Sequence, residues 1–196
     1  MGFTRAELER FRGREVDDLV GSGLKLLFVG INPGLWTAAV NTHFAHPGNR
    51  FYPALAAAGI IERPIDRAAG MTDAERERLE ARGIGITNLV PRATAKASEL
   101  SREELRAGGE RLLRFVAEHR PEVVAIAGIT AYRDAFGLRK AVLGRQPETL
   151  DDSAKWSGAA LWVVPNPSGL NAHETTESLA RAYAAPAAEA GLLPAA

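Results

Sequence analysis

Four short apolar segments alternate with longer segments of helical pattern, and this alternation constrains the fold most strongly. The apolar segments are residues 24–29, 84–90, 123–127 and 161–164. Each is apolar on both sides, as expected of a strand that is buried on both faces of a parallel sheet. Strands that alternate with helices form a parallel sheet with helices on both faces. The sequence therefore predicts an α/β fold, a three-layer sandwich with a central four-stranded parallel sheet flanked by helices.

The segments around these strands are predicted to be helices. They are residues 4–20, 49–59, 72–82, 101–119, 130–136 and 174–185. Thr4, Thr72 and Ser101 are each followed three residues later by Glu, which is the pattern of a capping box at a helix start. Residues 40–46 are predicted to be an ordered loop, and residues 137–158 a loop or an irregular hairpin.

The chain of 196 residues is most simply a single domain that spans residues 1–196. Residues 1–22 are expected to form an N-terminal helical extension, and residues 186–196, rich in Ala and Pro, a C-terminal tail. Residues 1–20 contain no signal-peptide core, and the apolar runs are far shorter than a membrane span. We therefore expect a cytoplasmic protein that works as a monomer and does not bind membranes.

The composition excludes several kinds of site. The 24 basic and 24 acidic residues give zero net charge, which argues against broad coating of nucleic acid but allows a locally basic face. The absence of cysteine removes disulfides, zinc–thiolate sites and iron–sulfur clusters. No Asp or Glu occurs from residue 30 to residue 61, which argues against metal–phosphate chemistry there. We expect neither a cofactor nor a bound metal.

Two turns rich in Gly and Pro follow apolar segments, and both contain asparagine. Gly-Ile-Asn-Pro-Gly at residues 30–34 follows the first apolar segment, and Asn-Pro-Ser-Gly-Leu-Asn at residues 166–171 follows the last. Ligands of open parallel sheets bind at the carboxyl ends of the strands. We therefore expect these two turns, together with the loop at residues 88–94, to lie on one edge of the sheet and to form one site.

Asn32 is the polar side chain of the first turn, and two interpretations of it are open. An Asn-Pro pair often only marks a turn, in which the side chain caps its own backbone. Alternatively, the amide holds a water molecule or a carbonyl group. A phosphate-binding loop is excluded because no Gly-Lys-Ser/Thr follows. A dinucleotide-binding turn is excluded because the glycine spacing is wrong and no acidic residue stands about twenty residues further on.

Four motifs together resemble the mismatch-specific uracil-DNA glycosylases, the bacterial relatives of thymine-DNA glycosylase. They are GINPGL at 30–35, FAHPGNRFY at 44–52, TNLV at 87–90 and PNPSGLN at 165–171. Their order and spacing extend through most of the chain. The resemblance implies a uracil-DNA glycosylase-like domain that flips uracil out of mismatched double-stranded DNA and hydrolyses its N-glycosidic bond without a cofactor.

The resemblance implies a pocket for the flipped base. Phe44 matches the family's stacking aromatic residue, and the backbone groups of Gly30 and Ile31 would hold the uracil carbonyls. Asn32 matches the catalytic residue that positions the attacking water. An amide cannot take a proton from water, so Asn32 would act by orientation and electrostatics. Asn88 stands where some members have Lys, and it would read the base edge or hold the water.

The resemblance also implies a DNA-binding turn. Leu170 is the candidate wedge that fills the space left by the flipped base. Gly169 and Asn171 would place backbone groups against the opposing base, and Ser168 would contact a phosphate. Asn166, at the start of this turn, stands where sister uracil-DNA glycosylases have His.

Several of these residues have plainer interpretations. Arg92 and Lys96 are expected phosphate contacts, and the alternative is ordinary solvated charge. Phe44 could belong to the core, and Leu170 could fold back onto it. Because no third ligand has suitable spacing, a metal pair with the neighbouring histidine is set aside, and His46 is expected to support its loop.

Two alanines depart from the pattern expected of the family. Ala172 stands where bacterial members tend to have Arg, which removes one DNA contact and leaves the opposite-base preference open. Ala93 is small and apolar in a loop that should border the pocket, where we would expect a polar residue or proline. A lower activity is expected from this replacement.

Three hypotheses for function follow. The first is a monofunctional uracil-DNA glycosylase that starts base excision repair, and it is expected to be slow because asparagines replace the acid and the histidine of sister enzymes. The second is a catalytically weak or inactive domain of the same fold that binds mismatched or damaged DNA. The third is an unrelated α/β nucleotide enzyme, which the missing acidic residues disfavour.

Overall fold

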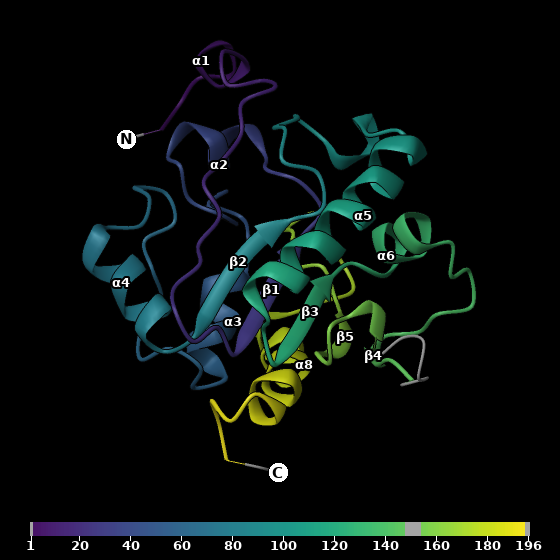
Figure 1. The fold of residues 1–196 in the computed structure, drawn as a ribbon. Coiled ribbons are helices and arrows are strands. Elements are labelled where there is room, and N and C mark those ends of the chain that lie inside the picture. The colour runs from purple at the N-terminus through teal and green to yellow at the C-terminus, as the bar shows by residue number, and fades with distance from the viewer. Residues whose placement is uncertain (1, 148–153, 195–196) are drawn as a thin grey trace.

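A computed structural model of the protein describes residues 2–147 and 154–194. Its centre is a five-stranded sheet of order β2-β1-β3-β5-β4 (Figure 1). The strands are β1 (Leu26–Gly30), β2 (Ile84–Asn88), β3 (Val123–Ala127), β4 (Gly144–Arg145) and β5 (Ala160–Val164). The pairs β1–β2, β1–β3 and β3–β5 are parallel. The predicted α/β fold with a central sheet flanked by helices is confirmed.

The sheet has one strand more than the sequence indicated. β4 pairs antiparallel with β5, through Gly144 opposite Val163 and Arg145 opposite Trp162. The prediction of four strands is therefore wrong in number, and the sheet is mostly rather than wholly parallel. Part of the predicted loop or hairpin at 137–158 thus forms an edge strand, while its residues 148–153 lie outside the described part. A strand of two residues is too short to leave a periodic pattern in a sequence.

Both faces of the sheet are covered, which explains why the strands are largely apolar. Along β1, Leu26 and Phe28 belong to the apolar cluster on one face, and Leu27 and Val29 to the cluster on the other. Successive side chains of a strand point to opposite faces, so successive side chains of β1 are apolar. All five residues of β1 are buried.

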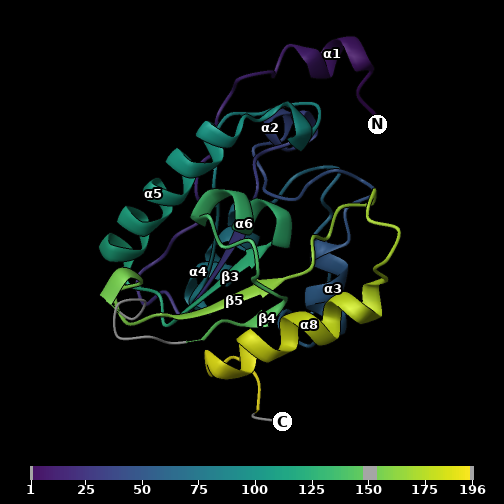
Figure 2. The same cartoon turned by 90° about the vertical axis from the view of Figure 1, so that its right-hand side faces the viewer.

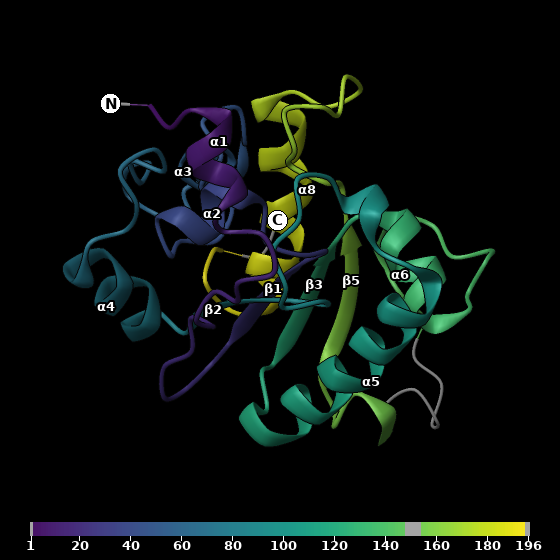
Figure 3. The same ribbon diagram turned by 90° about the horizontal axis from the view of Figure 1, so that it is seen from above.

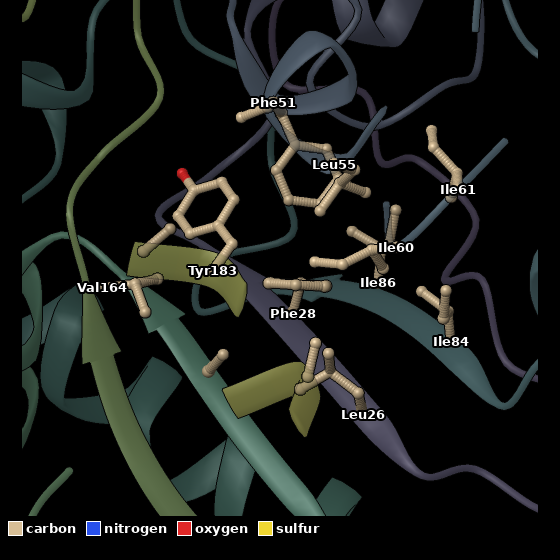
Figure 4. Packing of buried hydrophobic residues seen from close by; sticks show 14 of the residues in the cluster. Leu26, Phe28, Phe51, Leu55, Ile60, Ile61, Ile84, Ile86, Val164 and Tyr183 are labelled. Carbon is tan, nitrogen blue, oxygen red and sulfur yellow. The ribbon is translucent and has the colours of Figure 1, made fainter. Parts of the chain in front are cut away.

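Helices from separate parts of the chain form the two outer layers. They are α1 (Arg5–Glu9), α2 (Leu35–Ala39), α3 (Phe51–Ala57), α4 (Asp73–Ala81), α5 (Arg102–His119), α6 (Ile129–Phe136) and α8 (Thr176–Glu189), with a 3₁₀ turn η1 (Ala97–Glu99). α3 and α8 pack together on one face, and α5 and α6 on the other (Figure 2). The ring of Phe28 packs edge-on against Phe51 of α3 and lies beside Tyr183 of α8 (Figure 4).

The capping boxes predicted at Thr4, Thr72 and Ser101 are all present. The first helix nevertheless ends at Glu9, so the prediction of a helix over 4–20 is wrong. Val16 and Leu19 are buried, and Leu19 forms an antiparallel bridge with Ile86 of β2. Pairing with the edge of the sheet has overridden the local helical pattern, as tertiary contacts often do.

Two further boundaries differ from the predictions. α8 continues through Pro186 to Glu189, so the segment expected to be a tail is partly helical. Pro186 and Ala187 are buried, and this burial offsets the loss of one helical hydrogen bond at the proline. The short helix α2, directly after the first turn, was not predicted at all. The helix expected over 49–59 is present as α3.

The strand order places a topological switch point beside β1. The chain moves from β1 to β2 on one side and returns to β3 on the other. In open α/β sheets, ligands bind outside the carboxyl ends of the strands at such a point. α1 and α2 lie beyond this edge of the sheet in Figure 1, and Figure 3 shows the segment before α8 reaching the same side. The candidate site lies at this edge.

Candidate active site

Gly30 and Asn88 face each other at the ends of β1 and β2. A Cβ atom built on Gly30 would lie 2.4 Å from Asn88 Oδ1 and 3.2 Å from Cζ of the Phe44 ring. The three residues therefore pack closely together, and only glycine, which has no Cβ, allows Asn88 and the Phe44 ring to approach the end of β1 this far. The Gly30 carbonyl oxygen accepts a hydrogen bond from the Leu89 amide at 2.9 Å.

Phe44 has both a core contact and an open side. Its ring stacks on Phe51 with centroids 4.1 Å apart and planes inclined by 26°. The residue has a φ of 56° and is only partly buried. A left-handed backbone is costly for an aromatic residue and marks a position fixed by its surroundings. The interpretation of Phe44 as a core residue is thus partly right, because one face of its ring packs on Phe51 in the core, while the ring also lies beside Gly30.

Asn32 is anchored through its amide nitrogen. Nδ2 donates to Thr94 Oγ1 at 2.7 Å and to the carbonyl oxygens of Arg92 and Pro33, both at 3.1 Å. Oδ1 accepts no hydrogen bond from the residues that the structure describes, and the side chain is partly exposed. Turn capping accounts for one of these contacts only, the contact with Pro33. The free acceptor atom remains available to a water molecule or a ligand.

The backbone amides of Ile31 and Asn32 are also open. Within residues 2–147 and 154–194, neither amide donates a hydrogen bond to a protein acceptor. Buried amide groups are nearly always paired, and adjacent free amides at a strand end form a site for an anionic or carbonyl oxygen. The turn thus has two donors and one acceptor, the Asn32 Oδ1 atom, that form no hydrogen bond within the described part of the chain.

Asn88 is 6% exposed and is fixed from two sides. Its Nδ2 lies 3.0 Å from Nδ1 of His43. Its carbonyl oxygen accepts a hydrogen bond from the guanidinium of Arg111 at 2.9 Å. Arg111 forms an ion pair with Asp18 at 2.8 Å, and Asp18 also accepts a hydrogen bond from Thr87.

Residues 13–19, here called the N-terminal strap, connect the separate parts of this site. The Gly13 amide donates to the Ala93 carbonyl at 2.9 Å, and the Ala93 amide donates to the Arg14 carbonyl at 2.8 Å. The Asp17 carbonyl contacts the His43 ring at 3.0 Å. The strap therefore holds both the loop that anchors Asn32 and the histidine that contacts Asn88. Ala93 is fully buried at this junction.

The second turn is held against the loop before α3. The Arg50 guanidinium donates to the carbonyl oxygens of Ser168 and Asn171, both at 2.8 Å, and to that of Glu174. The Arg50 amide donates to the Pro167 carbonyl at 2.9 Å. One half-buried arginine thus fixes the whole turn through backbone oxygens.

Leu170 stands at the tip of this turn, with 89% of its surface exposed. The alternative that it folds back onto the core is wrong. A Cβ on Gly169 would lie 2.5 Å from the Gly48 carbonyl oxygen, so only glycine allows the turn to approach that loop. An apolar side chain this exposed, on a turn this tightly held, has the geometry of a wedge.

The polar side chains of the second turn largely stabilise the turn itself. Ser168 Oγ accepts from the Leu170 amide at 3.3 Å, and Asn171 Nδ2 donates to the Asn166 carbonyl at 3.1 Å. Asn166 Oδ1 accepts from the Ser168 amide at 2.9 Å. Asn166 Nδ2 has no acceptor among the described residues, and it and the Ile31 side chain both lie within 4 Å of the position that a Cβ atom on Gly128 would take. This nitrogen is free to contact a ligand near the first turn.

Arg92 and Lys96, the two basic residues of the loop after β2, differ in their contacts. Arg92 forms an ion pair with Glu104 at 2.5 Å, and this pair lowers the pKa of Glu104 to about 2. Arg92 would have to exchange this partner for a phosphate group. The Lys96 side chain is exposed and has no partner in the described part of the chain. The role of both residues as phosphate contacts stays a prediction.

His46 supports its own loop, as expected. Its Nδ1 accepts from the Gly48 amide at 3.1 Å, and its ring lies edge-on to Trp36. Among the residues described, no group of three His, Asp or Glu side chains could hold a metal ion. A cavity of about 650 Å³ lies between α6 and Trp156, and none of its lining residues belongs to the turns of the candidate site.

Sequence reasoning missed Arg50, Thr94 and the link between His43 and Asn88. Arg50 lies inside the FAHPGNRFY motif as a lone arginine in a segment without acids, but its partners are distant backbone oxygens, which leave no local pattern. Thr94 carries no such signal. The contact between His43 and Asn88 joins residues 45 positions apart, which no local pattern encodes.

Comparison with known proteins agrees with this geometry. The family model described as "Uracil DNA glycosylase superfamily" matches residues 18–187. The chain belongs to the uracil DNA glycosylase superfamily.

A structural match supports the superfamily fold. A solution NMR structure of a proposed uracil DNA glycosylase from Methanosarcina acetivorans superposes with a TM-score of 0.60 at 15% sequence identity. The match covers 92% of this chain and 98% of the other. Family and fold together support a DNA glycosylase that hydrolyses an N-glycosidic bond. Among the described residues, no helix is both long and apolar enough to cross a membrane.

Proposed function

We propose that this protein is a monofunctional glycosylase that excises uracil from mismatched double-stranded DNA and thereby starts base excision repair. The observation that carries the proposal is the state of Asn32. Its amide nitrogen is bound by Thr94, Arg92 and Pro33, while its Oδ1 atom has no partner among the described residues. A side chain with one atom anchored and the other open is suited to orienting a water molecule. The proposed enzyme needs no cofactor and acts as a monomer.

The proposed pocket accommodates the flipped base beside Phe44 and the end of β1 at Gly30. Phe44 offers an aromatic surface for stacking, and Asn88 Oδ1 lies at the edge of the same space. The free amides of Ile31 and Asn32 are donors for the base carbonyls. As the bond between C1′ and N1 breaks, its electron pair leaves with the base, and such donors stabilise the charge that develops on the carbonyl oxygens.

Water completes the reaction. Its oxygen bonds to C1′, and its released proton passes to the departing base or to solvent. Asn32 fixes the direction of approach and takes no proton, because an amide is not a base at neutral pH. The rate is therefore expected to depend on placement and on the leaving group. Mismatched uracil is favoured because a weakly paired base costs less to extrude.

The second turn would extrude the base and hold the duplex open. Leu170 is the exposed apolar side chain that would enter the stack, and Arg50 keeps its turn rigid. The proposed neighbours of the opposing base are Gly169 and Asn171, and the proposed phosphate contacts are Ser168, Arg92 and Lys96. The same chemistry would extend to related damaged pyrimidines that fit the pocket.

A labelled duplex with one G·U pair tests the proposal. Incubation with the protein followed by alkali should break the uracil strand, and Asn32→Ala should lower the single-turnover rate by about 10²-fold or more. Strand breakage that needs no alkali would contradict the monofunctional assignment. An unbroken uracil strand at large enzyme excess would overturn the proposal.

The absence of an acid and a histidine from the two turns favours one alternative function. A domain of this fold that binds mismatched DNA without hydrolysis would retain affinity for the G·U duplex and give no abasic product. Gel-shift and alkali-cleavage measurements on the same duplex separate the two functions.

A further inference from the structure

His43 is enclosed beneath the proposed base pocket, with 4% of its surface exposed. Its two ring nitrogens have different partners. Nε2 lies 3.0 Å from the backbone carbonyl oxygen of Asp17. Nδ1 lies 3.0 Å from the side-chain amide nitrogen of Asn88. The histidine therefore bridges the N-terminal strap and the base pocket.

These partners determine the tautomer of His43. A carbonyl oxygen can only accept a hydrogen bond, so Nε2 must carry the hydrogen. Burial lowers the pKa of His43 to about 4, against an opposing effect of Asp18 and Asp17 and with a smaller contribution from Arg76. The ring is therefore neutral at pH 7, and Nδ1 presents a lone pair.

The tautomer in turn determines the orientation of Asn88. An atom that faces the Nδ1 lone pair must be a donor, so Nδ2 of Asn88 points to His43. Oδ1 consequently points away from His43, toward Gly30 and the Phe44 ring. Oδ1 accepts no hydrogen bond from any residue in 2–147 or 154–194. The pocket is left with a fixed acceptor.

We propose that His43 is a specificity-determining positioning residue, which holds Asn88 with Oδ1 toward the flipped base and so selects a pyrimidine whose N3 carries a hydrogen. This inference rests on the proposed function and specifies the substrate of the same pocket. Uracil has N3–H, a donor for Oδ1. Cytosine has a lone pair at N3 and would place two acceptors against each other. Sites built to bond an N–H group reject analogues that lack it strongly.

The orientation of Asn88 depends on a residue that lies outside the range matched by the family model. Asp17 lies one residue before the matched range of 18–187. Its backbone position is fixed by a reciprocal pair with Asn41, in which the Asp17 amide donates to Asn41 Oδ1 and Asn41 Nδ2 donates to the Asp17 carboxylate. The N-terminal strap therefore orients the Asn88 amide in the proposed pocket through two contacts, from the Asp17 carbonyl oxygen to His43 and from His43 to Asn88.

The first test observes the tautomer directly. In protein labelled with ¹⁵N at histidine, long-range ¹H–¹⁵N spectra at pH 7 should show His43 protonated at Nε2 and unprotonated at Nδ1. A His43→Leu spectrum assigns the signal. A ring protonated at Nδ1, or at both nitrogens, at pH 7 would overturn the proposal. The NMR measurement does not require enzymatic activity.

The second test measures base preference without hydrolysis. Duplexes carry 2′-fluoro-deoxyuridine or 2′-fluoro-deoxycytidine opposite an abasic site, so that neither base is paired and neither is excised. The wild type should bind the uracil duplex at least about tenfold more tightly, because an unpaired buried acceptor disfavours cytosine. His43→Leu should reduce this preference to about threefold or less, because the Asn88 amide can then rotate.

A conservative variant distinguishes positioning from packing. The Gln side chain has a donor and an acceptor at its end, so His43→Gln should restore the preference that His43→Leu loses. An unchanged preference in His43→Leu would overturn the proposal, as would a wild type that binds both duplexes equally. A wild type that prefers uracil here and yields no abasic product from G·U DNA would instead contradict the proposed enzymatic function while leaving His43 in its role.

Discussion

Asn32 Nδ2 and Thr94 Oγ1 are 2.7 Å apart, the shortest of three contacts that hold the candidate catalytic amide. Thr94 is 1% exposed, and its own hydroxyl donates to the Lys96 carbonyl at 2.9 Å. The threonine therefore has a defined direction, with its lone pairs available to Asn32. The rotamer of Asn32 depends on a buried residue that touches no substrate.

Thr94→Val removes this anchor while keeping the shape of the side chain. We expect kcat for uracil excision to fall by about tenfold with little change in KM, because loss of orientation affects the transition state more than binding. Thr94→Ser keeps the hydroxyl and should retain most of the activity. Single-turnover kinetics on a G·U duplex measure both variants. A KM effect alone would assign Thr94 to DNA binding instead.

Gly30→Ala tests whether the residues packed at the end of β1 belong to the base pocket. The added Cβ would lie 2.4 Å from Asn88 Oδ1 and 3.2 Å from the Phe44 ring. Excision should fall by at least about tenfold, and overpacking should lower the free energy of unfolding by about 1–3 kcal/mol. Gly34→Ala is the matched control, since a Cβ there meets nothing within 4 Å. Comparable losses in both variants would contradict the assignment.

The strands and turns of this protein could be predicted because local chemistry determines them. Phe28 and its neighbours in β1 are apolar on both faces, and the Gly-Pro turn that follows can only end a strand. The capping boxes at Thr4, Thr72 and Ser101 were equally local, and all three form. That the two turns lie on one edge of the sheet was expected because both follow strands of a parallel sheet, whose carboxyl ends share one edge.

What could not be predicted depends on contacts distant in sequence. The segment after α1 has a helical pattern, yet Leu19 pairs with Ile86 instead. Arg50 fixes backbone oxygens more than a hundred positions away, at Ser168 and Asn171. Such contacts involve carbonyl oxygens, which every residue has, so side-chain patterns cannot reveal them. The candidate residues of the pocket were found by resemblance, but the atoms that orient them were not.

Leu170→Ala tests the wedge. Because 89% of Leu170 is exposed, the truncation should leave the free energy of unfolding within about 0.5 kcal/mol of the wild type. Excision from a G·U duplex should fall by about tenfold or more, and excision from single-stranded DNA should change little, because no stack must be filled there. Leu138→Ala, at another exposed leucine, should affect neither substrate. Equal losses on both substrates would remove the wedge role.

Arg50→Lys tests how the wedge turn is held. Arg50 donates to three carbonyl oxygens of the turn and of the residues that follow it, and an ammonium group cannot reproduce this planar set of donors. The free energy of unfolding should fall by about 2 kcal/mol, with a duplex-specific loss of excision like that of Leu170→Ala. Arg67→Lys, at an exposed arginine bound to the Pro47 carbonyl, should cost under about 0.5 kcal/mol. Urea unfolding compares the two variants.

The enclosed His43 makes stability depend on pH. Its pKa lies at about 4 in the folded protein against 6.5 for an ordinary histidine, chiefly because of burial. Between these values the unfolded chain binds a proton that the folded protein does not. Protonation of the unfolded chain therefore lowers the free energy of unfolding as the pH falls from 6.5 toward 4, and has little effect above pH 6.5. The total decrease caused by this one group is about 3 kcal/mol.

Urea unfolding between pH 7.5 and pH 4.5 measures this dependence. Over this interval the free energy of unfolding of the wild type should fall more steeply than that of His43→Leu, whatever the absolute stability of the variant. The acidic side chains with lowered pKa values, such as Glu104 at about 2, contribute mainly below this interval because their unfolded pKa is near 4.5. Equal slopes for both proteins would mean that folding does not lower the pKa of His43, so that its ring takes up a proton in the folded protein as readily as in the unfolded chain.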